Sequence, residues 1–305
     1  MKIIDIHTHG IGGYDTKTTL TRDILEIARI QGSRGVSEIL PTIYPGPLDE
    51  MRQNIAAVRE AWRSQAAGSW SPAAGLDSAT EVPSNKPARI LGVHLEGPFL
   101  NPLRCGALDP TSFLNPALDT LNRLIEGFED IVKIITLAPE LDGATRLIRT
   151  TADKGIIVSM GHSDATFGEA EAGFQAGAKG ITHIFNAMRP FHHREPGIAG
   201  FGLINKHVYI EVIADPFHLH PETIKMVFAV KDPAKIIIVS DSVKETKSGQ
   251  RADAMAGITD SKGVLKGGSM TVTEAAERLV QLGIDEDLLM SCITSNPSSY
   301  LRAYL

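Results

Sequence analysis

Eight short runs of apolar and β-branched residues recur along the chain, and they limit the possible folds more than any other feature. They span residues 3–6, 36–40, 89–95, 131–137, 156–160, 181–184, 208–213 and 235–239. Runs that are apolar on both faces are typical of strands in a parallel sheet that is covered by helices.

Amphipathic segments fill the gaps between these runs, as expected for helices. They span residues 21–31, 48–65, 116–126, 144–154, 166–177 and 221–230. Strands and helices that alternate in this way indicate an α/β fold, and eight strands predict a (β/α)8 barrel of the TIM type. A doubly wound open sheet is the alternative.

The length of the chain agrees with one barrel. Such a barrel typically uses about 250 residues, and the chain has 305, so we expect residues 1–305 to form a single barrel domain. Residues 66–88 are rich in Ala, Ser, Gly and Pro, which predicts a surface loop. After the eighth run, residues 258–265 predict a small hairpin, and residues 273–281 and 286–295 predict two further helices.

The charge balance argues against large polyanionic partners. The chain carries 36 acidic and 30 basic residues, a net charge of −6, so we expect neither nucleic-acid nor membrane binding. The first residues do not form a signal peptide, and no stretch of about 18 apolar residues occurs. Cys105 and Cys292 form no CxxC pair, which favours a reducing, cytoplasmic compartment.

Histidines and carboxylates follow most of the apolar runs, at the point where each predicted strand ends. They are His7 and His9, His94 and Glu96, His162, His183, Asp215 and His218, and Asp241. In a barrel the carboxyl ends of all strands face one mouth, where such folds place their active sites. Imidazole and carboxylate groups bind zinc and similar divalent ions. The sequence therefore predicts a metal site at the barrel mouth.

Two of these pairs need separate interpretation, because a lone histidine at a strand end is more often a hydrogen-bonded loop residue than a ligand. His7 and His9 lie two positions apart on a strand, so they point to the same face and can reach one ion. His94 stands in the same relation to Glu96. It could bind a metal directly or support the ligands from behind, and we favour the supporting role.

Several segments in a fixed order and spacing carry a family pattern. They are residues 92–100, 137–140, 161–166, 182–188, 194–200 and 213–218, followed by Ser240 and Asp241. Through them the chain resembles the N-acetylglucosamine-6-phosphate deacetylases of the amidohydrolase superfamily over nearly its whole length. The resemblance implies a metal-dependent hydrolase that removes the acetyl group from an N-acetylated amino-sugar phosphate.

The resemblance also implies the metal ligands. Glu96, His162 and His183 correspond to the ligands of the principal ion. His7 and His9 correspond to the ligands of a second ion, with Glu96 near both. The ligand types favour zinc, while iron, manganese and cobalt stay possible, as do one or two bound ions.

The catalytic and substrate-binding residues are implied in the same way. Asp241, also at the metal, corresponds to the catalytic carboxylate, and His218 to the histidine that polarises the substrate carbonyl. The residues that correspond to the sugar-phosphate site are Ala107, Asn186, Ala187 and Arg194. A guanidinium suits a phosphate because it makes paired, charge-assisted hydrogen bonds. A homodimer is a further implication.

The chain departs from the family pattern in three places. Leu108 stands where the family has a histidine that contacts the sugar, and Ser242 replaces a small apolar residue after Asp241. The family also has a small second β domain, whereas these 305 residues supply the barrel. The loss of the histidine leaves the exact sugar open.

Two alternatives therefore stay beside the deacetylase. One is an amidohydrolase that acts on a different N-acyl or cyclic amide substrate, and Leu108 is its motive. The other is a barrel that binds a sugar phosphate without catalysis. The set of Glu96, His162, His183 and Asp241 argues against it, because a pure binder needs no base beside a metal.

Overall fold

The computed structural model describes residues 2–68, 86–247 and 257–302. Eight parallel strands form one continuous sheet in sequence order, as the apolar runs predict. They are β1 (Ile4–Thr8), β4 (Glu38–Ile43), β6 (Val93–Glu96), β7 (Val132–Leu137), β8 (Ile157–Met160), β9 (Gly180–Ile181), β10 (Tyr209–Ile213) and β11 (Ile236–Val239). The short strand β5 (Arg89–Ile90) also pairs with β4 and precedes β6 in the third predicted run.

The sheet closes into a nearly complete barrel where its first and last strands meet. The amide of Asp241 donates to the carbonyl of His7 at 2.9 Å, and the amide of His9 donates to the carbonyl of Ser242 at 2.7 Å. These bonds lie just beyond the end of β11, at the mouth of the barrel. The prediction of a (β/α)8 barrel is therefore confirmed, and the open doubly wound sheet is excluded.

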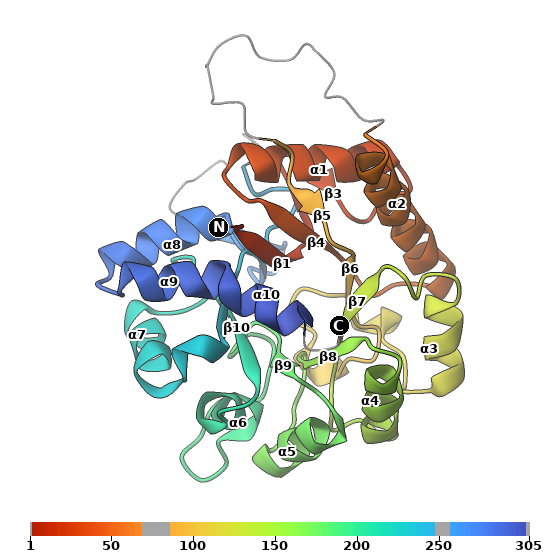
Figure 1. The fold of residues 1–305 in the computed structure, drawn as a ribbon. Helices are drawn as coiled ribbons and strands as arrows, with labels where there is room; N and C mark the ends of the chain where they lie inside the picture. Colours follow the sequence, from red (N-terminus) through yellow and green to blue (C-terminus); the bar gives the residue numbers. More distant parts are fainter. Residues whose placement is uncertain (1, 69–85, 248–256, 303–305) are drawn as a thin grey trace.

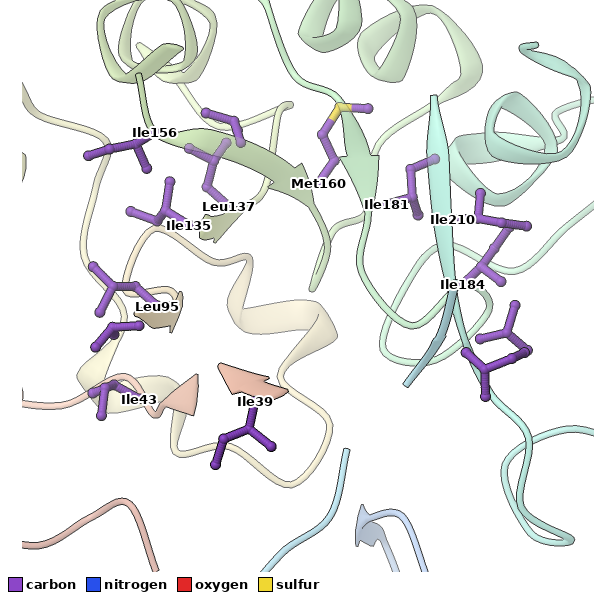
Figure 2. Packing of buried hydrophobic residues seen from close by; sticks show 14 of the residues in the cluster. Ile39, Ile43, Leu95, Ile135, Leu137, Ile156, Met160, Ile181, Ile184 and Ile210 are labelled. Atoms are coloured by element: carbon purple, nitrogen blue, oxygen red, sulfur yellow. The ribbon is translucent and has the colours of Figure 1, made fainter. Parts of the chain in front are cut away.

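Helices surround the strands in a ring (Figure 1). They are α1 (Thr21–Ser33), α2 (Leu48–Ala66), α3 (Leu118–Ile125), α4 (Ala144–Asp153), α5 (Phe167–Ala176), α6 (Gly197–Ile204), α7 (Pro221–Val230), α8 (Val272–Gln281), α9 (Glu286–Ile293) and α10 (Ser295–Arg302). A continuous layer of buried side chains fills the space between strands and helices. Figure 2 shows part of this layer, with Leu95, Leu137, Met160 and Ile181 contributed by successive strands.

A second, smaller core lies inside the barrel. Aliphatic side chains of several strands meet there, and Tyr300 of α10 packs with them at 1% exposure. Figure 1 shows α10 lying across the end of the barrel where β1 begins. This helix closes the end opposite the mouth, so the strand-end residues face the one open end.

Two hairpins add to the mouth. β2 (Gly10–Ile11) pairs with β3 (Tyr14–Asp15) directly after β1, and β12 (Ile258–Thr259) pairs with β13 (Leu265–Gly267) after β11. The second is the hairpin that the sequence predicts. Three short 3-10 helices complete the described elements, at Pro102–Arg104, Pro110–Ser112 and Pro233–Lys235.

Two expectations about elements change. The predicted strand 181–184 is wrong in length, because β9 ends at Ile181 and the chain turns with positive φ at His183 (30°) and Phe185 (73°). The sequence did not predict α6 or α10.

Most of the predicted loop 66–88, at residues 69–85, lies outside the described residues. In the part of the chain that the structure describes, no helix has the length and hydropathy of a membrane span.

Candidate metal centre and active site

Glu96, His162 and His183 meet at the barrel mouth, although they lie on three different strand ends. Glu96 Oε1 lies 3.1 Å from His162 Nε2 and 3.0 Å from His183 Nε2, and the two imidazole nitrogens lie 3.2 Å apart. All three residues are buried. Two ring nitrogens and a carboxylate oxygen that converge this closely in a buried place form a donor set suited to a divalent cation.

The hydrogen bond on the far side of His162 fixes which of its nitrogens can bind a metal. Its Nδ1–H donates to the backbone carbonyl of Arg104 at 2.9 Å, so Nε2 faces Glu96 and offers its lone pair to a metal when the ring is neutral. The protonation state of Glu96 also suits a metal ligand. Burial alone raises the pKa of Glu96, but the charge and hydrogen bond of His162 outweigh it and hold that pKa well below its usual value. Glu96 is therefore ionised at neutral pH.

His7, His9 and Asp241 form a second group against the other side of Glu96. His7 Nε2 and His9 Nε2 lie 3.2 Å apart, and His9 Nε2 lies 3.1 Å from Glu96 Oε2. Asp241 Oδ1 lies 3.4 Å from His7 Nε2 and 3.5 Å from His9 Nε2. Glu96 thus contacts both groups, and this arrangement matches the donor set of a second ion next to the first.

Glu211 orients His7 from behind. His7 Nδ1–H donates to Glu211 Oε2 at 3.0 Å, which leaves Nε2 directed toward His9. Burial lowers the pKa of His7, but the charge of Asp241 and the hydrogen bonds of Glu211 and Glu96 raise it well above its usual value. A proton or a cation is therefore strongly favoured among these side chains. A bound divalent ion would supply positive charge at this position.

His94 does not offer a free nitrogen. Its Nδ1–H donates to the carbonyl of Ile6 at 3.0 Å, and its Nε2 accepts from the hydroxyl of Thr136 at 2.8 Å. Burial and the charge of His7 hold the pKa of His94 well below its usual value, so the ring is neutral. This geometry agrees with the expectation that His94 supports the neighbouring ligands.

Three of the mouth residues hold a backbone conformation that side chains rarely adopt. His162, His183 and Asp241 have positive φ values of 46°, 30° and 47°. Such strain costs roughly 1–3 kcal/mol per residue and concentrates at functional sites. Here it turns the side chain after each strand into the mouth, away from the direction that a continuing strand would give it.

His218 and Asp215 form a pair after β10. His218 Nδ1–H donates to Asp215 Oδ1 at 3.0 Å. Burial lowers the pKa of His218, but the hydrogen bond and charge of Asp215 raise it more, so its pKa lies above the usual value. Burial raises the pKa of Asp215, yet its bonds to His218 hold that pKa well below the usual range. The pair therefore presents a histidine that keeps its proton readily.

A cavity of about 380 Å³ opens over these groups. Its wall contains His9, Glu96, His162, His183, His218 and Asp241 together with Ala107, Leu108, Asn186 and Ala187. The sequence analysis named all of these residues, and the fold brings them to one place.

Arg194 is the predicted substrate-binding residue that the fold does not bring to the cavity. It lies exposed in the segment before α6, and its backbone amide donates to His192 Nδ1 at 3.2 Å. The described wall of the cavity does not include it. Among the described residues, no ion pair joins Arg194 to the neighbouring Glu195, whose carboxylate accepts from the amides of Phe167 and Gly197.

The cavity wall also includes two polar side chains that the sequence analysis missed. Tyr44, just after β4, stacks on His9 with ring centroids 3.9 Å apart and an angle of 16°. Lys266 of β13, in the second hairpin, also lines the cavity. Tyr44 follows a strand end like the histidines, so the same rule could have found it. Lys266 lies on the hairpin outside the strand and helix alternation, where no such signal exists.

The chain is similar to several curated enzymes. It is 37% identical over 245 residues to the N-acetylglucosamine-6-phosphate deacetylase of Bacillus subtilis (strain 168), which covers 79% of this chain and 57% of that protein. It is 31% identical to the N-acetylgalactosamine-6-phosphate deacetylase of Escherichia coli O157:H7, covering 92% of this chain and 71% of that protein. For the N-acetylglucosamine-6-phosphate deacetylase of Vibrio furnissii the identity is 30%, covering 96% and 71%.

Solved structures agree with these relatives. The N-acetylglucosamine-6-phosphate deacetylase of Thermotoga maritima superposes with a TM-score of 0.81 at 27% identity, over 98% of this chain and 78% of that chain. The enzyme of Mycobacterium smegmatis gives a TM-score of 0.84 at 25% identity, over 99% and 78%. No family model matches the chain. The chain spans 57% to 71% of the three curated relatives, and it belongs to the N-acetylglucosamine-6-phosphate deacetylase family.

Proposed function

We propose that the chain hydrolyses the acetamide of an N-acetylated amino-sugar phosphate, releasing acetate and the free amine. The observation that carries this proposal is the convergence of Glu96, His162 and His183 with Asp241 and His218 on one cavity. An amide needs an activated water, a base, and a donor for the developing oxyanion, and the cavity offers side chains of each kind. The curated relatives support the choice of substrate class.

Glu96, His162 and His183 would hold the principal divalent ion, most suitably zinc, with iron, manganese and cobalt as alternatives. His7, His9 and Asp241 would hold a second ion where one binds. A divalent ion at this position supplies Lewis acidity, which lowers the pKa of a nearby water molecule and polarises a carbonyl group.

Asp241 would move the proton. Its carboxylate faces the cavity beside the His7 and His9 imidazoles, so it can accept a proton from the attacking water and deliver it to the leaving nitrogen. One carboxylate that acts first as base and then as acid typically contributes about 10²–10⁴-fold in rate.

His218 would donate a hydrogen bond to the acyl oxygen. Asp215 fixes its ring through Nδ1 and favours the protonated form, so the second ring nitrogen remains available as a donor. Ala107, Asn186 and Ala187 line the part of the cavity where the sugar would bind. The resemblance assigns the phosphate to Arg194, which lies outside that wall.

The proposal is tested with purified protein, an added divalent metal, and the 6-phosphates of N-acetylglucosamine and N-acetylgalactosamine. We expect acetate from at least one of them, and a loss of about 10²–10⁴-fold in kcat for Asp241→Asn. Metal-loaded protein that releases acetate from neither sugar would overturn the deacetylase assignment. Tight sugar-phosphate binding without turnover in that sample would favour the non-catalytic barrel.

Leu108 is the observation that favours a second candidate. It lines the cavity as an apolar side chain where the family pattern has a histidine. An amidohydrolase for a different N-acyl or cyclic amide would use such a surface. A panel that includes longer N-acyl groups and cyclic amides distinguishes it, because only this candidate predicts a preference for them over the acetyl substrates.

We further propose that residues 1–305 act as one catalytic barrel domain, as a homodimer in the cytoplasm. The resemblance supports the dimer. The two cysteines, Cys105 and Cys292, are free thiols, which supports a reducing compartment. Light scattering on the purified chain measures the oligomeric state directly, and a monomer at micromolar concentration would contradict the dimer.

A further inference from the structure

The imidazole of His9 is held differently from two of its neighbours at the barrel mouth. His7 and His162 each donate from Nδ1 to an acceptor behind the ring, at 3.0 and 2.9 Å. His9 is 2% exposed, yet its Nδ1 has no hydrogen-bond partner among the described residues. Its Nε2 points to the position of the second ion, beside Glu96 and His7. No hydrogen bond from behind therefore fixes the rotation of this ring about its Cβ–Cγ bond.

The ring of Tyr44 supplies a different constraint on His9. The two ring centroids lie 3.9 Å apart and the planes are inclined by 16°, so the rings are stacked. A stacked ring at this distance prevents the imidazole from turning out of its plane, because the edge of the turning imidazole would enter the volume of the phenol ring. The contact is made by the aromatic face of Tyr44 and not by its hydroxyl group.

His183 shows that this constraint is particular to His9. The Nδ1 of His183 is also buried without a hydrogen-bond partner among the described residues. Its ring, however, meets the ring of His162 edge-on, with centroids 4.9 Å apart and an angle of 86°. His162 is itself a candidate ligand of the principal ion. His9 is thus the mouth imidazole that stacks on a side chain outside the candidate ligands, in the part of the chain that the structure describes.

The backbone fixes Tyr44 next to His9 independently of the two rings. Thr16 is fully buried, and its amide donates to the carbonyl of His9 at 2.8 Å. The hydroxyl of Thr16 donates to the carbonyl of Thr42 at 2.7 Å, and Thr42 belongs to β4, which ends directly before Tyr44. A smaller or non-aromatic side chain at position 44 should therefore remove the stack and leave the backbone in place.

We propose that Tyr44 is the positioning residue of the second ion, because its ring holds His9 with Nε2 directed at that ion. This inference rests on the proposed function, in which His9 is a ligand of the second ion. Tyr44 acts through His9 and is not itself a ligand. The affinity for the second ion then depends on the aromatic ring at position 44. The principal ion does not share this dependence, because neither His162 nor His183 stacks on Tyr44.

The test is a titration of metal-free protein with cobalt, followed by visible absorption and by competition with a chromogenic chelator. Cobalt binds a given site more weakly than zinc, which helps to resolve both binding steps. Tyr44→Leu keeps an apolar side chain but loses the aromatic face. We expect the second cobalt to bind about 2- to 10-fold more weakly, which corresponds to the loss of one aromatic pair. The first cobalt should bind as in wild type, and Tyr44→Phe should bind both as tightly as wild type.

Tyr209→Leu is the matched control. Tyr209 is also half-buried, and its ring packs against the ring of Tyr300 with centroids 4.9 Å apart. It lies with Tyr300 at the closed end of the barrel, so its loss should leave both cobalt affinities unchanged. If Tyr209→Leu weakens the second cobalt as much as Tyr44→Leu does, the effect is a general loss of stability and the inference is overturned.

Other outcomes also decide against the role of Tyr44. The inference fails if wild type takes up only one cobalt, if Tyr44→Leu keeps the wild-type affinity for the second, or if it weakens both ions equally. A loss in Tyr44→Phe as large as in Tyr44→Leu would overturn it as well, since the hydroxyl group would then be responsible.

Acetate release from N-acetylated sugar phosphates, measured on the same samples, separates this inference from the function on which it rests. If the affinity for the second cobalt depends on the ring of Tyr44 but no acetate is released, the positioning role stands and the proposed hydrolysis fails. If wild type releases acetate with one ion bound and takes up no second, the hydrolysis stands and the inference fails.

Discussion

At the scale of single residues, the site depends on hydrogen bonds that lie behind the ligands. His162 is fixed by the carbonyl of Arg104, and His7 is fixed by Glu211. Each bond takes up Nδ1 and leaves Nε2 for the mouth of the barrel. Sequence reasoning found the imidazoles because they follow strands. It could not find Glu211, because Glu211 stands in the middle of β10, between apolar residues of the sequence.

Glu211 should therefore control metal affinity without being a ligand to the principal ion. In Glu211→Gln, the amide oxygen can still accept from His7 Nδ1–H, but the negative charge is lost, so we expect metal affinity to fall by about 10- to 100-fold. Competition with a chromogenic chelator measures this affinity. Glu222→Gln is the control, because Glu222 is exposed and pairs only with Lys225. Equal affinities for the two variants would contradict the role of Glu211.

His218 should make stability depend on pH. Its pKa in the folded protein is raised, so the fold holds this proton more tightly than the unfolded chain does. Its stabilising contribution is fully present below about pH 6.5, the unfolded pKa, and is lost as pH rises through the folded pKa. The difference in free energy of unfolding between wild type and His218→Gln should thus be larger at acidic than at alkaline pH. Chemical denaturation at matched metal content measures it, and a difference that grows with pH would exclude this assignment.

At the scale of elements, the strands were predictable and two of the helices were not. A strand that is buried on both faces leaves a continuous apolar run, and its carboxyl end leaves a polar residue. In contrast, α6 is apolar on nearly every side and holds three glycines, so it has no helical periodicity to detect. The short α10 is mostly polar and contains Pro297. Both helices are set by packing against the barrel.

The end of α6 is stabilised by a buried lysine. Lys231 Nζ donates to the backbone carbonyls of Gly202, Asn205 and Val208 at 2.6 to 2.7 Å. Lys231→Met would leave these acceptors without the ammonium, so we expect a loss on the order of 3 kcal/mol in free energy of unfolding. Lys225→Met should change little, because Lys225 lies exposed on α7, the helix that ends just before Lys231. Denaturant titration measures the free energy of unfolding of both variants, and equal values for Lys231→Met and Lys225→Met would refute the role of Lys231.

At the scale of the whole molecule, the barrel is closed at one end and chemically active at the other. Tyr300 fills the closed end, and a Cβ at Gly180 would lie 2.1 Å from its hydroxyl oxygen. The polar strand ends converge at the open end because all eight strands run in the same direction. For this reason, a search for polar residues at the carboxyl ends of predicted strands located most of the site. That search could not locate Lys266, because a hairpin outside the repeat delivers it.

Tyr300→Ala should weaken the whole barrel. Removing a large, fully buried ring typically costs about 3–5 kcal/mol. We expect the free energy of unfolding to fall by that amount, while the geometry of the distant metal centre, and so the metal affinity of the folded fraction, stays near the wild-type value. Ser299→Ala is the control, because Ser299 is exposed on the same helix. Metal affinity that falls together with stability would show that the two ends are coupled.

The most direct test of the central claim is a metal titration with acetate release measured on the same sample. Chelator-treated protein should release no acetate from its N-acetylated sugar-phosphate substrate, and activity should return in proportion to the first equivalent of added zinc. Glu96→Gln and His162→Ala, which lack a ligand of the principal ion, should not recover. Metal-free protein that hydrolyses the substrate at the wild-type rate would contradict the account.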